Sequence, residues 1–382
     1  MPGSPRILIA GGGIGGLALA QAARHGGLDV AVYERDPTPD TRNQGYRLHI
    51  DADGNAALRA CLPARALDRV RRTSAVNGDL VAAYTHRLER TAAQVFPGIA
   101  GDEITHVDRD TFRRALRTGL DDVVHFGRTV TGYRVTSAGR VRVEFAEGGS
   151  DEGDLLVGAD GVGSAVRRQL LPHAVVRDLG LRCLYGRMPL DATTGPEVPA
   201  DFDRGFCWVA DDTGYGAGFA PVRFRSRPGD TPDYLMTTLV ATPARLGRTD
   251  QDLFGMTSEA LWQLAVTATA DWHPTVRRLL AHADPGSFFP IVIRAAERVA
   301  AWPAGPVTLL GDAVHTMPPT GGVGANTALQ DAATLSGELL RGGRPLTEAV
   351  AAYQAVMLPR GFDTVERSVR MARQLLAVPG AP

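Results

Sequence analysis

The stretch GDAVHTMPPTGGVGANTALQDA, from Gly311 to Ala332, brings together groups that could bind a ligand. A carboxylate, Asp312, follows the apolar run VTLL at 307–310, and two prolines and three glycines then lead into a helix-like segment. Glycines at the start of a helix leave backbone N–H groups free to approach an anion or a phosphate. The stretch is therefore predicted to form one part of a binding site.

A second glycine turn, Gly11-x-Gly13-x-x-Gly16, opens the chain. Residues 6–10 read as a buried strand, the segment after the glycines as a helix, and residues 29–35 as the next strand, which makes one βαβ unit. Glu34 ends the second strand, where its carboxylate can accept hydrogen bonds from a ribose. This pattern indicates a dinucleotide site for NAD or FAD, and the acidic residue disfavours NADP there.

The remaining elements predict an α/β fold with an inserted antiparallel sheet. DRDTFRRALRTGL (108–120) reads as a helix with Asp108 near its N-cap, and residues 140–149 alternate as an exposed strand. From about 180 to 295 most segments read as antiparallel strands, with a helical interruption at 261–283. Residues 327–372 read as mostly helical, and the last few residues as a frayed end.

These elements predict a Rossmann-like (βαβ) nucleotide-binding domain, an antiparallel substrate-binding sheet domain and C-terminal helices. The expected boundaries are 1–70, 100–178 and 291–340 for the discontinuous nucleotide-binding domain, 71–99 and 179–290 for the sheet domain, and 341–382 for the C-terminal helices.

A third motif lies in the middle of the chain, in DLLVGADGVGSAVR from Asp154 to Arg167. With the two glycine-rich stretches, it resembles the class A FAD-dependent monooxygenases of the para-hydroxybenzoate hydroxylase type. The family patterns GADGxxSxVR and GDAxHxxxPxxGxGxN are both complete here, and the three motifs occur in family order from about residue 6 to 335. The resemblance implies that FAD is the cofactor and that NADH or NADPH binds transiently as the reductant.

The resemblance also assigns roles in holding FAD. Asp312 is expected to bind the ribityl chain, the helix that starts near Gly324 and Asn326 to face the flavin N1–C2=O edge, and Asp160 to serve both FAD and NAD(P)H. Arg109, in HVDRDTFRRAL, is expected to reach the phosphate–ribitol part. The full set of expected cofactor-binding residues is Gly11, Gly13, Ile14, Gly15, Gly16, Glu34, Arg35, Arg109, Val130, Asp160, Gly311, Asp312, Pro319, Gly322, Gly324 and Asn326.

Substrate-binding and catalytic residues are harder to place, because the flavin itself supplies the chemistry. QGYRLHID (44–51) departs from the family by carrying Tyr46, Arg47 and His49. Arg47 could hold an anionic substrate, assist flavin movement or lie on a solvated edge strand. His315 is a candidate acid–base group or a packing residue. The expected substrate-lining residues are Arg47, Trp208, Tyr215, Phe219, Met236, Met317, Pro318 and Thr320.

Composition excludes several other classes. The formal net charge is −1, which favours neither nucleic acid nor an anionic membrane as a partner. All 41 basic residues are arginine, so a P-loop lysine, a Schiff-base lysine and a catalytic lysine base are excluded. The three cysteines and nine histidines show no metal-binding spacing, so no metal site is expected. No apolar run is long enough to span a membrane, and the cysteine usage favours the cytoplasm.

The expected function is an FAD-dependent monooxygenase that uses NAD(P)H and O₂ to hydroxylate or epoxidise an aromatic or polycyclic small molecule. In the family this reaction proceeds through a flavin C4a-hydroperoxide. Two alternatives stay open, a flavin-dependent oxidase or dehydrogenase on the same scaffold and a non-catalytic FAD-binding protein. Substrate identity, the choice of NADH or NADPH, the type of oxidation and the oligomeric state do not follow from the sequence.

Overall fold

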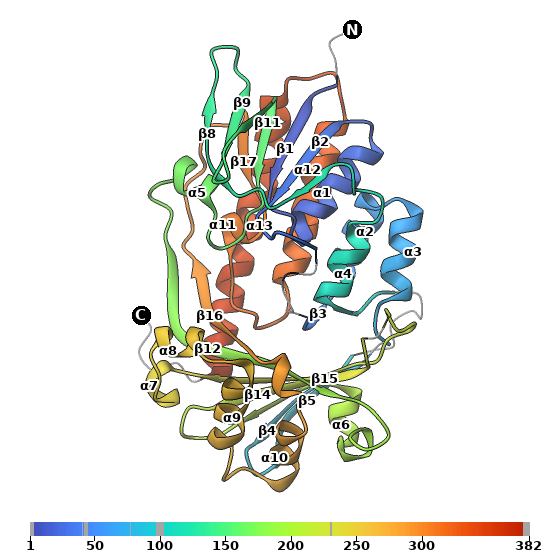
Figure 1. Cartoon of the computed structure of the whole chain (residues 1–382), viewed down its shortest axis with the longest axis vertical. Coiled ribbons are helices and arrows are strands. Elements are labelled where there is room, and N and C mark those ends of the chain that lie inside the picture. The colour runs from blue at the N-terminus through green and yellow to red at the C-terminus, as the bar shows by residue number, and fades with distance from the viewer. Residues whose placement is uncertain are drawn as a thin grey trace.

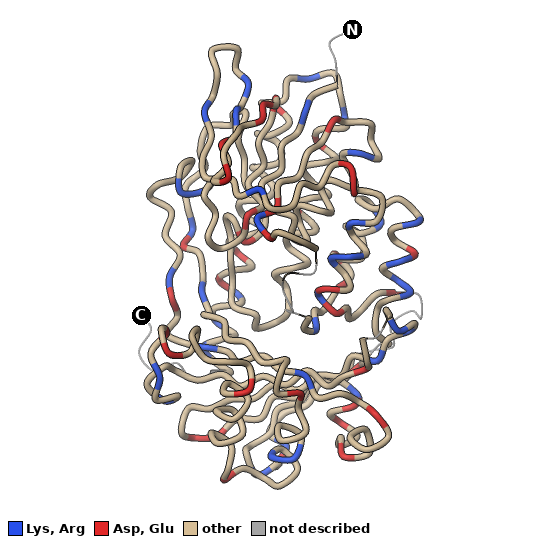
Figure 2. Tube along the Cα trace, viewed as in Figure 1, with Lys and Arg blue, Asp and Glu red and all other residues tan. Residues whose placement is uncertain are grey.

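The computed structural model covers the whole chain of 382 residues and describes residues 4–39, 41, 45–76, 78–96, 103–229 and 231–376. Its residues form two layers, with a parallel sheet and its helices in the upper half of Figure 1 and a larger sheet below. Basic and acidic residues are interspersed along both layers (Figure 2). Gln44 and the C-terminal VPGAP, which the sequence placed in a strand region and a frayed end, lie outside the described residues.

The upper layer is built on a five-stranded parallel sheet. Its strands are short apolar runs that are buried on both faces, as expected when helices cover a parallel sheet. In sheet order the strands are β17 (Val307–Leu309), β11 (Leu155–Gly158), β1 (Arg6–Ala10), β2 (Asp29–Glu34) and β7 (Val124–Phe126). Because all five run parallel, their carboxyl ends, which the three sequence motifs follow, meet at one edge.

Helices that pack on this sheet form most of the core of the upper layer. α1 (Ile14–His25) lies directly against α12 (Gly324–Leu340), although 310 residues separate their first residues in the chain. The other helices of this layer are α2 (Ala52–Cys61), α3 (Ala64–Arg72), α4 (Arg109–Leu116), α5 (Ala165–Leu170), α11 (Asp312–His315) and α13 (Leu346–Leu376). The two glycine-rich stretches of the sequence are therefore brought together by helix packing.

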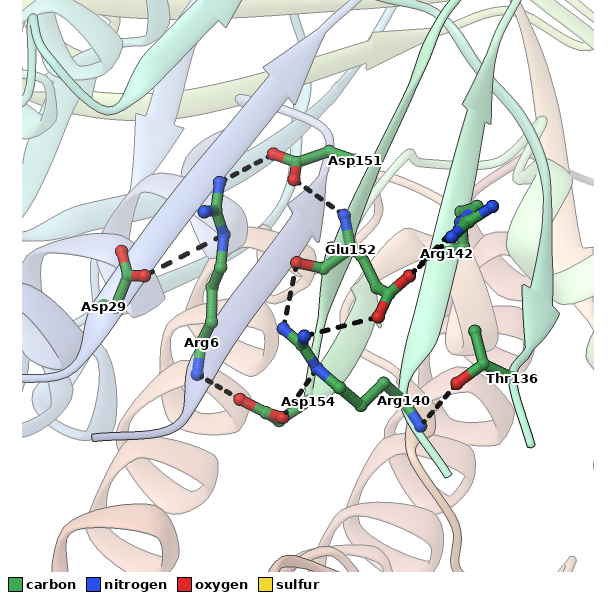
Figure 3. Close-up of polar contacts among 8 residues, drawn as sticks. All are labelled: Arg6, Asp29, Thr136, Arg140, Arg142, Asp151, Glu152 and Asp154. Carbon is green, nitrogen blue, oxygen red and sulfur yellow. Dashed lines mark hydrogen bonds and ion pairs between the residues drawn. The ribbon is translucent and has the colours of Figure 1, made fainter. Parts of the chain in front are cut away.

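A three-stranded antiparallel sheet lies at the top of the upper layer (Figure 1). It consists of β8 (Val130–Val135), β9 (Val141–Phe145) and β10 (Ser150–Gly153). Figure 3 shows how ion pairs tie it to the start of β1: Arg6 bonds Asp151 at 2.7 Å and, through its backbone N–H, Asp154 at 2.8 Å. These groups are substantially exposed, so the network orients the sheet more than it stabilises the fold.

The lower layer is a seven-stranded mixed sheet. In order its strands are β16 (Phe289–Ala296), β12 (Val176–Pro189), β15 (Tyr234–Ala241), β14 (Gly216–Val222), β13 (Gly205–Ala210), β4 (Leu80–Thr85) and β5 (Arg90–Val95). All neighbours are antiparallel except β13 and β4. β12 and β16 pair over much of their length and connect the two layers (Figure 1). The boundary that the sequence predicted between the sheet domain and the nucleotide-binding domain, at residues 290 and 291, lies within β16.

The two faces of the lower sheet have different neighbours. On one face of the lower sheet, alternate residues pack against short helices that lie below it in Figure 1. The other face turns toward the upper layer. The helices below are α6 (Ala200–Arg204), α7 (Pro243–Leu246), α8 (Asp250–Gly255), α9 (Ser258–Ala268) and α10 (Pro274–Ala281), with 3₁₀ turns η1 (Gly195–Glu197) and η2 (Pro285–Ser287). The sequence predicted this combination of parallel sheet, antiparallel sheet layer and C-terminal helices, and the fold class is confirmed.

A two-stranded ribbon lies between the layers. It pairs β3 (Arg47–His49) with β6 (His106–Asp108) in antiparallel register and packs against β14 of the lower sheet. β6 leads directly into α4, whose N-cap is Asp108, as the sequence predicted. The ribbon places residues 45–51 of the polar QGYRLHID stretch at the junction of the two layers.

Candidate functional site

The N-terminal glycine turn combines tight packing with open space. Gly11 has φ +107°, and a Cβ added there would lie 2.3 Å from the carbonyl oxygen of Ala159 in the middle motif. Gly13, in contrast, has an ordinary φ of −79° and nothing within 4 Å of an added Cβ. Gly11 therefore joins two motifs, while Gly13 opens a space at the N-terminus of α1.

No side chain of the described residues caps the N-terminus of α1 or of α12. α2 and α4 differ, because Asp51 and Asp108 accept hydrogen bonds from their first-turn N–H groups. Uncapped N–H groups attract phosphate and other negatively charged oxygens, and the helix dipole adds to this attraction. Since α1 and α12 pack side by side, one extended ligand can contact both N-termini.

Glu34 holds the first glycine turn in place. Its two carboxylate oxygens accept hydrogen bonds from the N–H of Gly12 and of Asp36, both at 2.9 Å. Arg113 bonds the same carboxylate at 3.0 Å and donates through Nε to the Gly12 carbonyl at 2.8 Å. Sequence reasoning missed Arg113; its signal was its position one helical turn after Arg109, on the same face of α4.

Asp312 is the first residue of α11, shortly after the carboxyl end of β17. Its side chain is exposed to solvent, yet protein surrounds it so closely that burial raises the pKa of its carboxyl. Arg109 lies near enough to oppose this shift of the Asp312 pKa. Its Nη1 lies 3.6 Å from a carboxylate oxygen of Asp110 but is enclosed without a hydrogen-bond partner among the described residues. An accessible carboxylate beside a guanidinium with a free hydrogen-bond donor fits the hydroxyls and phosphates of a ribityl-phosphate chain.

The middle motif contributes a second unsatisfied group. One oxygen of Asp160, Oδ2, accepts a 2.7 Å hydrogen bond from the N–H of Ala165 at the start of α5. The other, Oδ1, is enclosed and has no partner among the described residues. Arg167 is satisfied by the carbonyls of Ala313 and Val162 and ties this motif to the late one.

The side chains of several expected cofactor-binding residues contact other parts of the protein or point away from the site. Asn326 is buried, and its amide donates to the carbonyls of His49 and Gly322 and accepts from the N–H of Asp51, so it positions the ribbon against α12. Only its backbone is left for a ligand. The Val130 side chain is buried in the core and Arg35 is exposed just beyond β2.

His315 does not face the cleft. It is fully buried, and its Nε2 lies 2.6 Å from Asp331, a buried carboxylate of α12. Burial alone would lower the pKa of His315, but the Asp331 carboxylate outweighs that effect and raises it. Direct acid–base contact with a substrate is therefore excluded in this conformation, and His315 is a packing residue that joins α11 to α12.

The four expected substrate-lining residues of the lower sheet divide between its two faces. Trp208 and Met236 pack on the face toward the upper layer, where Trp208 lies flat over Gly216. Tyr215 and Phe219 lie on the opposite face, in the core between the sheet and the short helices below it. The strands are the expected ones, but the two-residue period allows only alternate side chains to face the cleft.

The late motif places its apolar residues near the cleft. Pro318 is buried, whereas Met317 and Thr320 are half-buried. Thr320 donates a hydrogen bond to the carbonyl of Ser368 at 2.8 Å, which anchors this turn to α13. Their contact with a substrate stays a prediction.

A polar cavity of about 670 Å³ opens beside the ribbon, between α3, α4, the end of β12 and the start of β15. Arginines and aspartates both line it, among them Arg69, Asp110, Arg114 and Asp284. Tyr234 lines it as well and donates a hydrogen bond to Asp108 at 3.0 Å.

Trp208 and Tyr215 lie on opposite faces of the lower sheet, so substituting them should have different effects on stability and on substrate binding. Trp208→Phe should leave the free energy of unfolding nearly unchanged, because its Nε1 has no partner among the described residues, and should alter the KM for substrate. Tyr215→Phe removes a 2.7 Å hydrogen bond to the Arg245 carbonyl, so it should cost about 1 kcal/mol of stability and leave kcat/KM unchanged. Urea unfolding and steady-state kinetics of both variants check this; the reverse pattern contradicts the assignment of the faces.

Comparison with known proteins agrees with this geometry. Residues 267–368 match the family model described as an FAD binding domain. The chain is 32% identical to the dual O-methyltransferase/FAD-dependent monooxygenase CTB3 of Cercospora beticola, over 95% of this chain and 45% of that protein. It is 28% identical to the aurachin C monooxygenase/isomerase of Stigmatella aurantiaca, over 96% of this chain and 88% of that protein. The chain thus spans about half the length of the first curated relatives it matches.

Solved structures give the same result. A structure from Photorhabdus luminescens, provisionally described as an FAD-containing monooxygenase, superimposes with a TM-score of 0.84 at 28% identity, covering 99% of this chain and all of that one. The uncapped helix N-termini, the open space at Gly13 and the unsatisfied atoms of Arg109 and Asp160 fit the phosphates, sugar chain and ring of FAD. The fold and cleft are those of an FAD-binding flavoprotein. Within that class, the resemblance to the class A FAD-dependent monooxygenases that the sequence predicted is confirmed.

Among the described residues, no helix is long and apolar enough to cross a membrane. No group of three or more His, Cys, Asp or Glu residues in the same part of the chain could hold a metal ion.

Proposed function

We propose that this protein uses NADH or NADPH and O₂ to hydroxylate or epoxidise an aromatic or polycyclic small molecule. The observation that carries the proposal is the packing of α1 against α12, whose N-termini are both left uncapped by the described side chains, in the layer toward which the apolar face of the lower sheet turns. Bound FAD supplies the redox chemistry there, taking electrons from the reductant and passing them to oxygen.

The residues of the chain bind and orient the cofactor in this proposal. The N–H groups at the start of α1 hold the pyrophosphate, and Glu34 keeps the turn that presents them in shape. Asp312 and Arg109 bind the ribityl-phosphate part, since both reach the cleft with unsatisfied or accessible groups. The N-terminus of α12 faces the ring, where its dipole favours the negative charge of the reduced state.

The face of the lower sheet that carries Trp208 and Met236 excludes water from the substrate side. Tyr46 of the upper layer extends this surface, because its ring lies 4.9 Å from that of Tyr185 and 6.1 Å from that of Phe289. A dry, aromatic wall suits a flat aromatic substrate, and exclusion of water protects reactive oxygen species from unproductive decay. The relatives' monooxygenase names also support oxygen insertion.

A cytoplasmic location is part of the same proposal. The three cysteines, Cys61, Cys183 and Cys207, are all buried and form no disulfide. Burial raises the pKa of each thiol, so they behave as small apolar side chains.

A screen of NAD(P)H consumption tests the proposed function. The purified protein, reconstituted with FAD, is mixed with NADH or NADPH under air and a panel of hydroxylated aromatic compounds. We expect at least one compound to stimulate nucleotide oxidation and to gain one oxygen atom by mass spectrometry. Conversion of a compound without gain of oxygen would favour an oxidase or dehydrogenase, and failure to take up FAD would contradict any flavoenzyme.

A further inference from the structure

The ribbon between the layers directs four polar side chains at the lower sheet. Leu48 and Val107 pack into the core of the upper layer, so the alternate residues face the other way. Those residues are Arg47, His49, His106 and Asp108. The hydrogen bond between Asp108 and Tyr234 of β15 confirms that this side of the ribbon meets the sheet.

Asp108 forms no ion pair with its cross-strand neighbour Arg47, because its two oxygens are directed at other donors. One of its oxygens caps α4 by accepting from the N–H of Thr111 at 2.9 Å, and the other accepts from Tyr234 at 3.0 Å. Arg47 forms no side-chain hydrogen bond or ion pair with any described residue, and its Nε is enclosed without a partner among them. The described part of the chain thus provides this guanidinium, at the junction of the layers, with no counter-ion.

This guanidinium stays charged. Burial lowers the pKa of Arg47 to about 10, which is still well above neutral pH. Burial and the charge of Arg47 also lower the pKa values of His49 and His106, so neither ring adds a positive charge at neutral pH. An enclosed cation without a partner is unfavourable, and an anion that reached it would relieve that cost.

The position of Arg47 relates it to the flavin site. A Cβ added at Gly322, in the turn before α12, would lie 3.1 Å from the Cβ of His49, and Asn326 donates a hydrogen bond to the His49 carbonyl at 3.0 Å. β3 is therefore fastened to the turn that leads into α12. Arg47 lies two residues earlier, on the side that faces the sheet.

The opposing sheet face supplies a second donor and aromatic surface. Trp208 is nine-tenths buried, and its Nε1 has no hydrogen-bond partner in the described part of the chain. Tyr234 and Met236 lie on the same face. Two unsatisfied donors, one of them a cation, with aromatic surface nearby, match an aromatic ring that carries an anionic oxygen group.

We propose that Arg47 binds the carboxylate of an aromatic acid, so that the substrate of the proposed oxygenase reaction is itself acidic. The inference rests on the proposed function for the ring and the reaction, but the anion site stands on the unpartnered guanidinium. Arg47 is then a residue that determines substrate specificity and positions the ring; it takes no part in oxygen transfer.

Ligand binding to the FAD-loaded protein tests this proposal without a known substrate. The probes are 1-hydroxy-2-naphthoate and its neutral amide, which share ring and hydroxyl and differ in charge. Titration is followed by the change in flavin absorbance. We expect the acid to bind at least tenfold more tightly than the amide to the wild-type protein. In Arg47→Gln the acid should lose about 10- to 100-fold in affinity while the amide changes little.

The control variant is Arg134→Gln, which removes a highly exposed arginine of β8 and should preserve the preference for the acid. Equal binding of acid and amide to the wild-type protein, or no binding of the acid at any attainable concentration, would overturn the proposal. That comparison needs no variant, so it decides the matter even if Arg47→Gln does not fold. FAD content and NAD(P)H oxidation are measured separately, so failure of the anion site is distinguishable from failure of the proposed function.

Discussion

Asp331→Ala is expected to destabilise the fold by about 3–5 kcal/mol, a large share of the stability of an ordinary domain. The Asp331 carboxylate is fully buried and accepts hydrogen bonds from the Gly311 N–H at 2.9 Å and from Arg360 at 2.8 Å, besides its 2.6 Å contact with His315. Removing it leaves two basic side chains and a backbone donor without their acceptor. Urea unfolding at neutral pH measures the loss.

The same substitution should weaken FAD retention, because Asp331 fixes the backbone of Gly311 immediately before Asp312. The control is Asp363→Ala on α13, whose carboxylate is half-exposed and pairs with Arg298 at the surface; it should change stability by no more than about 0.5 kcal/mol. A loss of less than about 1 kcal/mol for Asp331→Ala would show that the buried network does not hold the late motif.

The Asp331–His315 pair also predicts how stability depends on pH. His315 and Arg360 outweigh burial and lower the pKa of Asp331, so its contribution is present above the ordinary value of 3.8 and is lost as pH falls through the lowered value. The raised pKa of His315 acts in the opposite sense, because its contribution is complete below 6.5 and is lost as pH rises through the raised value. The pair should therefore stabilise the fold most between these limits, and Asp331→Ala should flatten the profile.

The second large effect is expected at the first glycine turn, where two neighbouring glycines should behave differently. Gly11→Ala places a Cβ 2.3 Å from a backbone oxygen at φ +107°, so we expect a loss of about 4 kcal/mol or more in the free energy of unfolding. Gly13→Ala meets no atom within 4 Å and keeps an allowed φ, so its cost should stay near 1 kcal/mol.

Gly13→Ala should nevertheless reduce FAD affinity about tenfold or more, because the new methyl group fills the space where a phosphate approaches the helix N–H groups. Thermal unfolding and the FAD content of the purified proteins separate the two effects. If Gly13→Ala binds FAD as well as the wild-type protein does, the N-terminus of α1 is not the pyrophosphate site.

The motifs and the fold class could be predicted because they depend on local patterns. Gly11, Gly13 and Gly16 follow a buried apolar run, and the acid at position 34 ends the next one; the structure brings these features to one edge of the parallel sheet. The N-cap at Asp108 could be predicted for the same reason. A short polar side chain just before a segment with helical periodicity can accept hydrogen bonds from the N–H groups of the first turn.

Side-chain facing and long-range partners could not be predicted. Tyr215 and Phe219 lie in or beside strands of the expected sheet, but a single sequence does not say which alternate set faces the cleft. The amide of Asn326 is used by His49, Asp51 and Gly322, and the first two of these lie about 275 residues away in the chain. Such pairings follow from packing of whole elements, which motif spacing does not encode.

The most direct test of the account is the origin of the oxygen atom in the product. FAD-loaded protein is supplied with NAD(P)H, ¹⁸O₂ and the best compound from the screen, and the product is examined by mass spectrometry. The account predicts a product that carries one ¹⁸O atom, and no label when H₂¹⁸O replaces ¹⁸O₂. Product without ¹⁸O, with the labelled oxygen recovered only as hydrogen peroxide, would contradict a monooxygenase.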